Sequence, residues 1–358
     1  MADVTQSPHH LHRKFGSDRR GEDLGRRDGE RDLSDSRRQR TAVSGTERVL
    51  RLEYMDGILV PAMSFKHDIL TDALLYQARP GDIFLATYPK TGATWTQYIL
   101  WTLLNLEKEK ALPSFGDIMT SLAPFLELVG REAVERLPEP RIIKHHLPFS
   151  RSPYHPKAKY VVIVRNPFDC AVSFYHHCLG DRFNMGMRAD TTFDEFFEEF
   201  VDGHVPFGEY FEHVLSWYAR RKDPNVFFFY YEKLKKDQAQ WILKIAEFID
   251  ESLADRLRKD EVLLKDVVRR TSFENMKATV KIAGDVHKKE HVQEPEDSGS
   301  FTPLKNFFRK GRVGDWRSYF KYDQEQRLRR VYERRMRGTE MWDVWKEYLG
   351  YDNAETIQ

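Results

Sequence analysis

Four short apolar runs recur along the chain, and longer amphipathic stretches separate them. The runs lie at residues 82–87, 141–144, 160–164 and 226–230. They lack the alternation of apolar and polar residues that marks a strand with one face in water. Runs of this kind are typical of strands in a parallel sheet that is buried on both faces.

The segments between the runs carry a helical pattern. Trp95, Ile99, Leu103 and Leu106, for example, recur at a spacing that places them on one face of a helix. Strands that alternate with helices predict a three-layer α/β fold, in which helices cover both faces of a central parallel sheet. We assign this fold to a single domain at residues 47–358, which contains no internal repeat.

Two segments depart from this pattern. Residues 1–46 contain ten Lys or Arg and eight Asp or Glu without a periodic apolar face, which predicts a disordered, mixed-charge tail. Its acids nearly cancel its bases, which argues against a basic interaction arm. Residues 277–302 are also polar, and inside a domain such a long loop is often a lid. We therefore predict a mobile lid there.

Composition excludes several classes of protein. The 358 residues carry 57 Lys and Arg against 56 Asp and Glu, a balance unlike that of a dedicated nucleic-acid binder. The two cysteines, Cys170 and Cys178, can build neither a disulfide framework nor a zinc site. No stretch approaches the ~20 apolar residues of a membrane span, and the N-terminus lacks the apolar core of a secretory signal. We expect a cytoplasmic protein that binds no metal, nucleic acid or membrane.

The first chemical signal follows the run at 82–87. Thr87-Tyr88-Pro89-Lys90-Thr91-Gly92-Ala93-Thr94-Trp95 joins a predicted strand to a predicted helix. In that position successive main-chain N–H groups and the helix N-terminus face an anion, and Lys90 adds a mobile positive charge. The hydroxyls of Thr91 and Thr94 add donors. The glycine-rich run of a Walker A loop is missing before Lys90.

This loop resembles the 5′-phosphosulfate loop of the cytosolic sulfotransferases, Tyr-Pro-Lys-Ser-Gly-Thr-Thr-Trp, with Thr91 in place of Ser and Ala93 in place of the first Thr. Three further segments resemble motifs of that family in the same order. Residues 141–148 are similar to the strand that carries its Lys-Thr-His, and residues 165–173 to its 3′-phosphate motif. Residues 309–316 are similar to its Arg-Lys-Gly-x-x-Gly-Asp-Trp signature. The resemblance covers the chain from about Met55 to the C-terminus.

The resemblance implies the donor 3′-phosphoadenosine 5′-phosphosulfate (PAPS) and the product 3′-phosphoadenosine 5′-phosphate (PAP). Residues expected to hold the 5′-phosphosulfate are Lys90, Thr91, Gly92, Ala93, Thr94 and Trp95. The 3′-phosphate is assigned to Arg165, Ser173, Arg309, Lys310 and Gly311. Around the adenine we expect Trp95, Tyr231, Thr271, Phe273, Phe307 and Phe308.

The acceptor must lose a proton as it attacks, and histidine has a suitable pKa. The chain offers His145 and His146, and neighbouring residues of a strand point to opposite faces, so only one can meet the acceptor. The family pattern assigns the base to His146, with Lys144 on the same face against a sulfonate oxygen. His145, where the family has Thr, is expected to be structural or surface-facing. The implied catalytic residues are thus Lys90, Lys144, His146 and Ser173.

The expected reaction moves the sulfuryl group of PAPS, by in-line attack, to a hydroxyl or amine of a small aromatic or sterol-like acceptor. Phe125 matches a family position in an apolar acceptor pocket, and Phe65 is a second candidate for its wall. These residues do not choose among a phenol, catechol, amine, sterol or alcohol.

Other readings fit the sequence less well. A nucleotide kinase needs a Walker A motif and carboxylates for Mg²⁺, and we find neither. A Golgi carbohydrate sulfotransferase starts with a membrane anchor, which we do not expect here. A catalytically silent relative would not need all four catalytic residues. The family's dimer motif, Lys-x3-Thr-Val-x3-Glu, falls on Arg317, Lys321, Tyr322 and Gln326. Because its apolar centre and acid are lost, we predict a monomer or an atypical homodimer.

Overall fold

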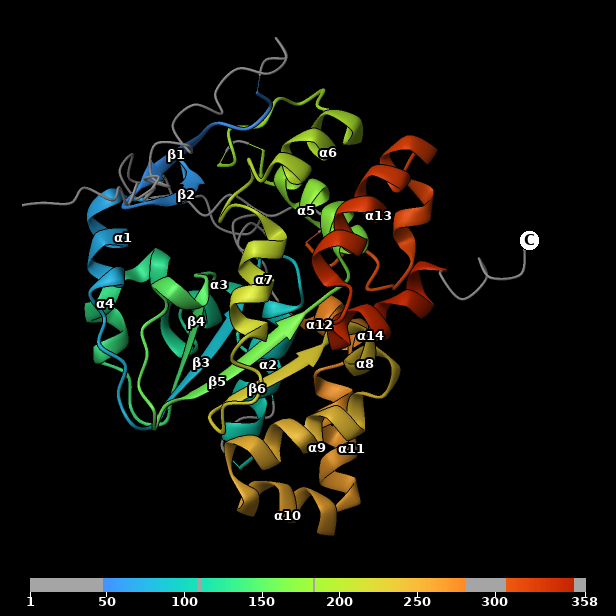
Figure 1. Ribbon diagram of the computed structural model, residues 1–358. Coiled ribbons are helices and arrows are strands. Elements are labelled where there is room, and N and C mark those ends of the chain that lie inside the picture. Colours follow the sequence, from blue (N-terminus) through green and yellow to red (C-terminus); the bar gives the residue numbers. More distant parts are fainter. Residues whose placement is uncertain (1–47, 108–110, 183, 281–306, 351–358) are drawn as a thin grey trace, which may run out of the picture. The chain divides into compact units, whose positions relative to one another are not determined.

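The computed structural model describes residues 48–107, 111–182, 184–280 and 307–350. Its centre is a sheet of four parallel strands in the order β4-β3-β5-β6 (Figure 1). The strands are β3 (Asp82–Thr87), β4 (Arg141–His145), β5 (Lys159–Val164) and β6 (Val226–Tyr230). Each coincides with one of the four apolar runs to within a residue. The predicted α/β fold is confirmed.

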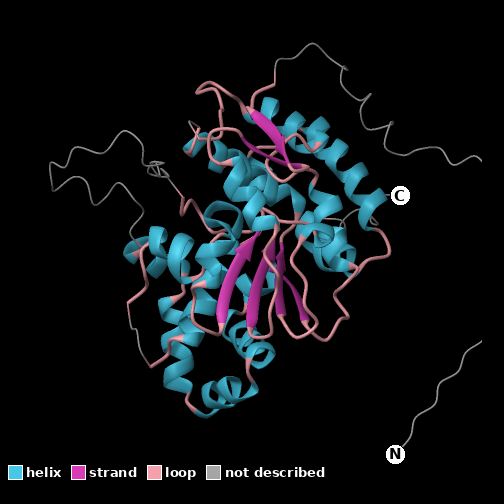
Figure 2. Ribbon diagram, turned by 90° about the vertical axis from the view of Figure 1, so that its left-hand side faces the viewer, coloured by secondary structure: helices cyan, strands magenta, loops and turns pink. Residues whose placement is uncertain are grey.

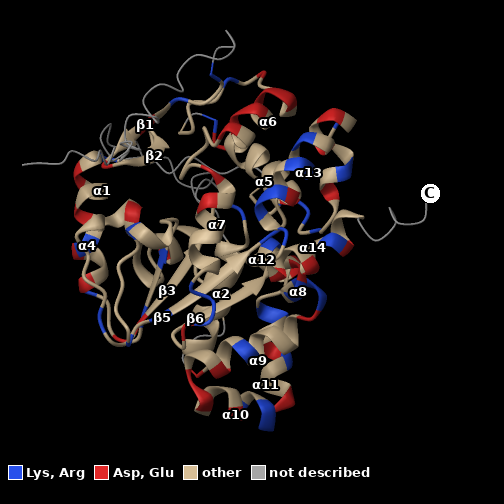
Figure 3. Ribbon diagram, in the orientation of Figure 1, with Lys and Arg blue, Asp and Glu red and all other residues tan. Residues whose placement is uncertain are grey.

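Successive side chains of the strands enter two separate hydrophobic cores, because side chains of a strand alternate between its faces. Phe84 of β3 belongs to one core, and its neighbour Ile83 to the other. Helices therefore cover both faces (Figure 2), and most charged residues lie on helices and loops rather than on the sheet (Figure 3). Burial on both faces explains why the runs are continuously apolar.

The core of Phe84 is packed by α5 (Pro167–Gly180), α6 (Phe193–Asp202), α7 (Tyr210–Tyr218), α13 (Tyr322–Met336) and α14 (Glu340–Leu349). The core of Ile83 is packed by α2 (Ala93–Leu104), α8 (Tyr231–Lys236), α9 (Gln238–Ile249), α10 (Glu251–Lys259), α11 (Glu261–Arg270) and α12 (Phe273–Thr279).

A smaller apolar cluster lies beneath an antiparallel hairpin of β1 (Leu52–Met55) and β2 (Ile58–Pro61), and includes Leu70 of α1 (His67–Leu74). The segment before β4 contains α3 (Phe115–Asp117), the π-helical turn η1 (Ile118–Leu122) and α4 (Leu126–Glu135). Two short 3₁₀ turns complete the described elements, η2 (Phe149–Arg151) and η3 (Asp315–Ser318).

Two predicted segments fall outside this description. The tail at 1–46 lies entirely outside the described residues, as does 281–302 of the predicted lid. The first residues of that predicted lid, Lys277 to Thr279, are the last turn of α12. Both assignments stay predictions. Among the residues described, no helix is long and apolar enough to cross a membrane.

All four strands end on the same edge of the sheet, and the candidate residues follow these ends. Lys90 comes after β3, His146 after β4, Arg165 after β5 and Tyr231 after β6. Ligands of parallel α/β sheets bind outside the carboxyl ends of the strands. The fold thus gathers four distant sequence motifs at the edge where a ligand is expected.

Candidate functional site

The loop between β3 and α2 takes a backbone path that few residues tolerate. Lys90 has φ +68° and Gly92 has φ +119°. A Cβ on Gly92 would lie 2.9 Å from Cδ1 of Ile163, so glycine is required for space as well as for conformation. The turn directs the start of α2, whose first N–H groups have no partner inside the helix, toward the cavity beside it.

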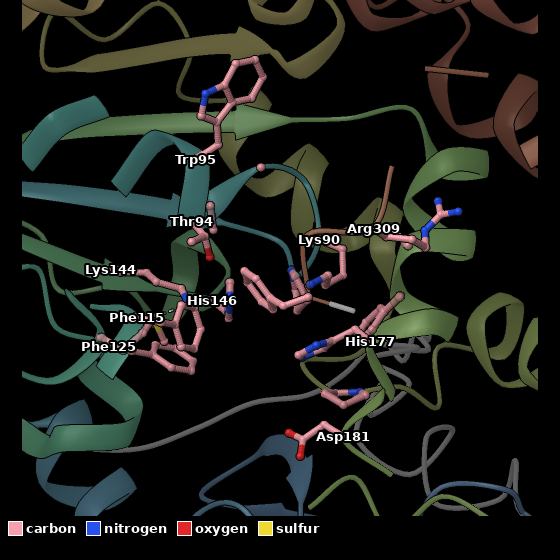
Figure 4. Close-up of a pocket in the computed structure, with 18 of the residues that line it drawn as sticks. Lys90, Thr94, Trp95, Phe115, Phe125, Lys144, His146, His177, Asp181 and Arg309 are labelled. Atoms are coloured by element: carbon pink, nitrogen blue, oxygen red, sulfur yellow. Dashed lines mark hydrogen bonds between the residues drawn. The ribbon is translucent and has the colours of Figure 1, made fainter. Parts of the chain in front are cut away.

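That cavity has a volume of about 520 Å³ and lies at the carboxyl edge of the sheet. Eighteen of the predicted site residues line it. They come from all four strand ends, from the loop before α1, from the N-cap of α4, from α2, α5 and α12, and from residues 307–311. Figure 4 draws part of the lining. These residues are Phe65, Lys90, Gly92, Ala93, Thr94, Trp95, Phe125, Lys144, His146, Arg165, Ser173, Tyr231, Phe273, Phe307, Phe308, Arg309, Lys310 and Gly311.

Four of the predicted phosphate-binding residues that line this cavity are Lys or Arg. Lys90 and Arg165 follow β3 and β5, and Arg309 and Lys310 come from the C-terminal signature. Arg165 is buried, its guanidinium lies 4.4 Å from the ring centre of Tyr231, and its Nε has no hydrogen-bond partner among the described residues. Arg165 is the buried member of this group, whereas Lys90 and Arg309 are partly exposed and Lys310 is exposed. Cations grouped in this way have the charge that a phosphate requires.

Asp169 of α5 anchors the C-terminal signature beside Arg165. Its carboxylate accepts hydrogen bonds from the main-chain N–H groups of Gly314, at 2.8 Å, and Trp316, at 3.2 Å. Within the signature, Asp315 forms ion pairs with both Arg309 and Lys310. Residues some 140 positions apart are thereby held in one group. Asn166 caps α5 ahead of a first-turn proline.

Flat aromatic side chains border the next part of the cavity. Trp95 and Tyr231 pack edge to face with ring centres 5.6 Å apart, and Phe273 meets Phe308 at 6.2 Å. Gly311 has φ +59°, and a Cβ there would lie 2.6 Å from the Phe273 ring. The main chain therefore approaches this aromatic group as only glycine allows.

The opposite end of the cavity is a chamber of three phenylalanines, Phe65, Phe125 and Phe207, which meet pairwise with ring centres 5.8–6.2 Å apart. Lys144 and His146 open onto this chamber. Nζ of Lys144 lies 4.2 Å above the Phe125 ring, and the His146 ring lies 4.9 Å from it. Figure 4 shows Lys144, His146 and Phe125 together, with Lys90 and Arg309 across the cavity.

His146 is held in one tautomer. Its Nδ1 lies 2.7 Å from the main-chain oxygen of Thr87, which can only accept, so Nδ1 carries the proton and Nε2 has the free lone pair. Burial, followed by the nearby charge of Lys144, lowers the pKa of His146 well below the usual 6.5. The imidazole is therefore neutral at physiological pH and able to accept a proton.

His145 points the other way. Its ring lies in the opposite core, 5.7 Å from the ring of Phe84, and burial lowers its pKa to about 3. Its Nδ1 accepts from the Leu147 N–H, and its Nε2 pairs with the Ser152 hydroxyl. Of the two predicted locations for His145, the surface is wrong, because the side chain is fully buried.

The two lysines of the cavity also have shifted pKa values. Burial lowers the pKa of Lys90 to about 8 and that of Lys144 to about 7. Neighbouring positive charges lower these pKa values further, since Lys90 lies near Lys144 and Arg165 lies near Lys90. An anion in the cavity would reverse these shifts by stabilising both ammonium groups.

Two predicted residues do not line the cavity. The Thr91 hydroxyl turns inward and donates to the Tyr88 carbonyl. The Thr271 hydroxyl donates to the Val267 carbonyl, and only its main-chain oxygen reaches the site, where it accepts from the indole of Trp95 at 2.8 Å. In both cases the hydroxyl satisfies a neighbouring carbonyl, as is common for threonine in a turn or at a helix end.

The sequence analysis also missed residues of the lining. Lys235 lies over the rings of Trp95 and Phe273, at 5.8 and 5.6 Å. His177 faces the cavity from α5, and Phe207 completes the phenylalanine chamber. His177 could have been found, because it lies four residues after Ser173 and so shares its helix face. Lys235 and Phe207 belong to no motif.

A parallel α/β sheet whose anion-binding loop, grouped cations and apolar chamber share one cavity is the arrangement of a nucleotide-dependent transferase. Comparison with known proteins narrows this class. The family model described as "Sulfotransferase domain" matches residues 80–340. Sulfotransferase 1B1 of Mus musculus is 37% identical over 277 residues, which cover 74% of this chain and 85% of the relative.

Solved structures agree. The crystal structure of mouse sulfotransferase SULT7A1 complexed with PAP is 30% identical, with a TM-score of 0.63, and the match covers 85% of this chain and 99% of that one. Retinol dehydratase in complex with androsterone and the inactive cofactor PAP is 25% identical, with a TM-score of 0.63 and coverage of 82% and 92%. The chain belongs to the cytosolic sulfotransferase family and is a PAPS-dependent sulfotransferase.

Proposed function

We propose that the enzyme sulfates a hydroxyl or amine of a small aromatic or sterol-like acceptor, and that His146 is the general base. The observation that carries this proposal is the geometry of His146. Its Nδ1 lies 2.7 Å from the Thr87 carbonyl oxygen, and the ring borders both the phenylalanine chamber and Lys144. A base must stand where the acceptor's proton is released, and Nε2 of His146 fits that position.

The donor fits the residues of the other half of the cavity. PAPS carries a 3′-phosphate and a 5′-phosphosulfate, and the cavity offers Lys90, Arg165, Arg309 and Lys310 together with a helix N-terminus. Arg165 supplies a buried Nε without a partner among the described residues. Together with Ser173, Arg309, Lys310 and Gly311 it would hold the 3′-phosphate. Trp95, Tyr231, Phe273 and Phe308 would enclose the adenine.

Beyond its expected place near the adenine, we propose a second role for Phe307, whose ring packs 5.3 Å from that of Phe308. Nζ of Lys90 lies 4.7 Å above the Phe307 ring, and this ring packs against Phe115 with centres 4.7 Å apart. Phe307 thus lies between the two halves of the cavity. We assign it to the wall around the reacting groups, where its apolar face would help to exclude water.

Bound PAPS supplies the sulfuryl group, and the protein orients it and balances its charge. Lys90 would place its ammonium on the leaving 5′-phosphate, and Lys144 would contact a sulfonate oxygen. As the acceptor attacks, Nε2 of His146 takes its proton. The resulting imidazolium is stabilised by the Thr87 carbonyl on the other ring nitrogen.

The acceptor class follows from the chamber. Its walls are aromatic on three sides, which favours a flat apolar body with one nucleophilic hydroxyl or amine near His146. The relative retinol dehydratase was solved with androsterone, a ligand of that kind.

A panel of acceptors tests this proposal. With PAPS, phenols, aromatic amines and sterols should be sulfated, whereas sugars of similar size should not. If a polar sugar is sulfated as fast as the phenols, the chamber has been misassigned as the acceptor pocket.

A further inference from the structure

A short segment of the chain extends the sheet beside the end of β4. The Lys144 N–H donates to the Pro124 carbonyl at 2.9 Å, and Phe125 forms a parallel bridge with Lys144. Phe125 is itself fixed by its N–H, which donates to the Met119 carbonyl at 2.8 Å. The wall of the acceptor chamber is therefore hydrogen-bonded directly to the strand that leads to His146.

The main-chain hydrogen bonds between this segment and β4 end after Lys144. In a parallel pair, alternate N–H groups of a strand face the same neighbour, so the His146 N–H is the next donor after that of Lys144. The facing chain turns into α4 at Leu126. Instead of a main-chain carbonyl, the side chain of Glu127 meets this donor, and its Oε1 accepts from the His146 N–H at 2.6 Å.

The other peptide group of His146 is also held by a side chain. Nε2 of His213, in α7, donates to the His146 carbonyl at 3.0 Å. With the Thr87 carbonyl on Nδ1, three elements thus fix His146: β3 the ring, α4 the N–H and α7 the carbonyl. Glu127 lies in the first turn of α4, and Phe125 is the N-cap residue of that helix.

We infer that Glu127 is a positioning residue for sulfuryl transfer, which sets the imidazole of His146 relative to the Phe125 wall through the main-chain N–H. This inference rests on the proposed role of His146. Glu127 is not among the residues that line the cavity, so it would touch neither donor nor acceptor. It acts through the base.

The chemistry of Glu127 argues against a purely stabilising role. The side chain is fully buried, and its Oε2 has no hydrogen-bond partner among the described residues. Burying an unsatisfied polar atom costs free energy, which an apolar side chain would avoid. Burial raises the pKa of Glu127 to about 8, in agreement with this cost. The carboxyl instead provides a rigid hydrogen-bond acceptor for the N–H of His146.

The test compares variants of two buried glutamates. Glu199 of α6 is matched to Glu127, because it is buried and accepts a main-chain N–H, that of Val49, at 3.1 Å, but it lies away from the cavity. Glu127→Ala, Glu127→Asp, Glu127→Gln and Glu199→Ala are measured for Tm, PAP affinity, and kcat and KM with acceptors of graded acidity. Glu127→Asp retracts the carboxyl by one methylene, so it serves if Glu127→Ala does not fold.

Glu127→Ala and Glu127→Asp should lower kcat, by on the order of 10²-fold for the alanine variant. PAP affinity should stay unchanged, and the loss should shrink for acidic phenols, which need less help from a base. Glu127→Gln keeps an acceptor oxygen and should retain most activity. Glu199→Ala should lower Tm alone.

The inference is overturned if Glu127→Ala or Glu127→Asp lowers Tm as Glu199→Ala does but leaves kcat unchanged for every acceptor. A loss of the same size for all acceptors also overturns it, because the base would then not be involved. His146→Ala is measured alongside. If that variant stays active with weakly acidic acceptors, the proposed base is wrong, which is a separate failure.

Discussion

Nδ1 of His146 lies 2.7 Å from the main-chain oxygen of Thr87, and the Thr87 hydroxyl lies 3.1 Å from the same nitrogen. The sheet register creates this contact, because Ala86 pairs with His145 and the next residues of β3 and β4 meet where both strands end. The contact fixes the tautomer of His146 and leaves Nε2 for the acceptor. It also places the imidazole beside Thr87, which precedes Pro89 and Lys90 of the loop between β3 and α2.

The low pKa of His146 predicts the pH dependence of turnover. A base is active in its neutral form, so a pKa well below 6.5 extends activity toward acid. With saturating PAPS and an aliphatic alcohol as acceptor, kcat should therefore show no ionisation near pH 6.5. The measurement is kcat from pH 5.5 to 8. A fall in kcat with a midpoint at 6.5 would mean that the imidazole is solvated rather than buried.

Arg165 is predicted to recognise the 3′-phosphate. Arg165→Ala should weaken PAP binding by about 1.5–3 kcal/mol, roughly ten- to a hundred-fold in Kd, since a hydrogen bond to a charged group is lost. Adenosine 5′-phosphate lacks the 3′-phosphate, so its affinity should be weak and nearly equal in both proteins. Titration calorimetry with the two nucleotides gives both values. Equal losses of affinity for PAP and for adenosine 5′-phosphate would show that Arg165 does not recognise the 3′-phosphate.

The lowered pKa of Lys90 predicts that PAP binding takes up protons. Near pH 8 the lysine is about half protonated in the free enzyme, and a bound phosphate stabilises the ammonium form. PAP affinity should therefore fall as pH rises above 8. Calorimetry at pH 8 in two buffers with different ionisation enthalpies measures the uptake. Lys90→Arg keeps its charge throughout and should take up fewer protons, whereas a binding heat that is independent of buffer in the wild type would contradict the account.

The strands and the donor residues could be predicted because their signals are local. Each strand is a continuous apolar run, and Lys90, Arg165 and Arg309 lie within motifs that follow a strand or form a signature. The hairpin of β1 and β2 gave no such signal. Both strands have four residues, and two of those in β1, Glu53 and Tyr54, are exposed, so the pattern of β1 is weak.

The rest of the site depends on tertiary contacts that spacing does not encode. Glu127 meets His146 across 19 residues, and His213 meets it across 67. The opposite directions of the His145 and His146 side chains could be predicted, because side chains alternate between the faces of any strand. By contrast, the sequence contains no signal for the positive φ of Lys90 or for the hydrogen bond from the Thr91 hydroxyl to the Tyr88 carbonyl.

The altered dimer motif predicts a monomer or an atypical homodimer. Lys321 is engaged within the chain, where it pairs with Asp194, while Tyr322 is 74% exposed and lacks the small apolar character of the family motif. Light scattering at micromolar concentration should show no dimer that depends on these residues. A stable dimer that is lost when Lys321 and Tyr322 are changed would show that the contact survives in altered form.

The central claim is that His146 removes the acceptor's proton and does not itself bind the donor nucleotide, which occupies the other half of the cavity. His146→Ala should lose about 10²- to 10⁴-fold in kcat with a weakly acidic alcohol. Its affinity for PAP should be unchanged. His145→Gln is the matched control, since the amide replaces a buried imidazole that points into the opposite core.

The decisive measurement is kcat of these two variants with PAPS and a series of acceptors of increasing acidity. The account predicts a large loss for His146→Ala that narrows as the acceptor becomes more acidic, and near-normal turnover for folded His145→Gln. An active His146→Ala beside an inactive, folded His145→Gln would contradict it.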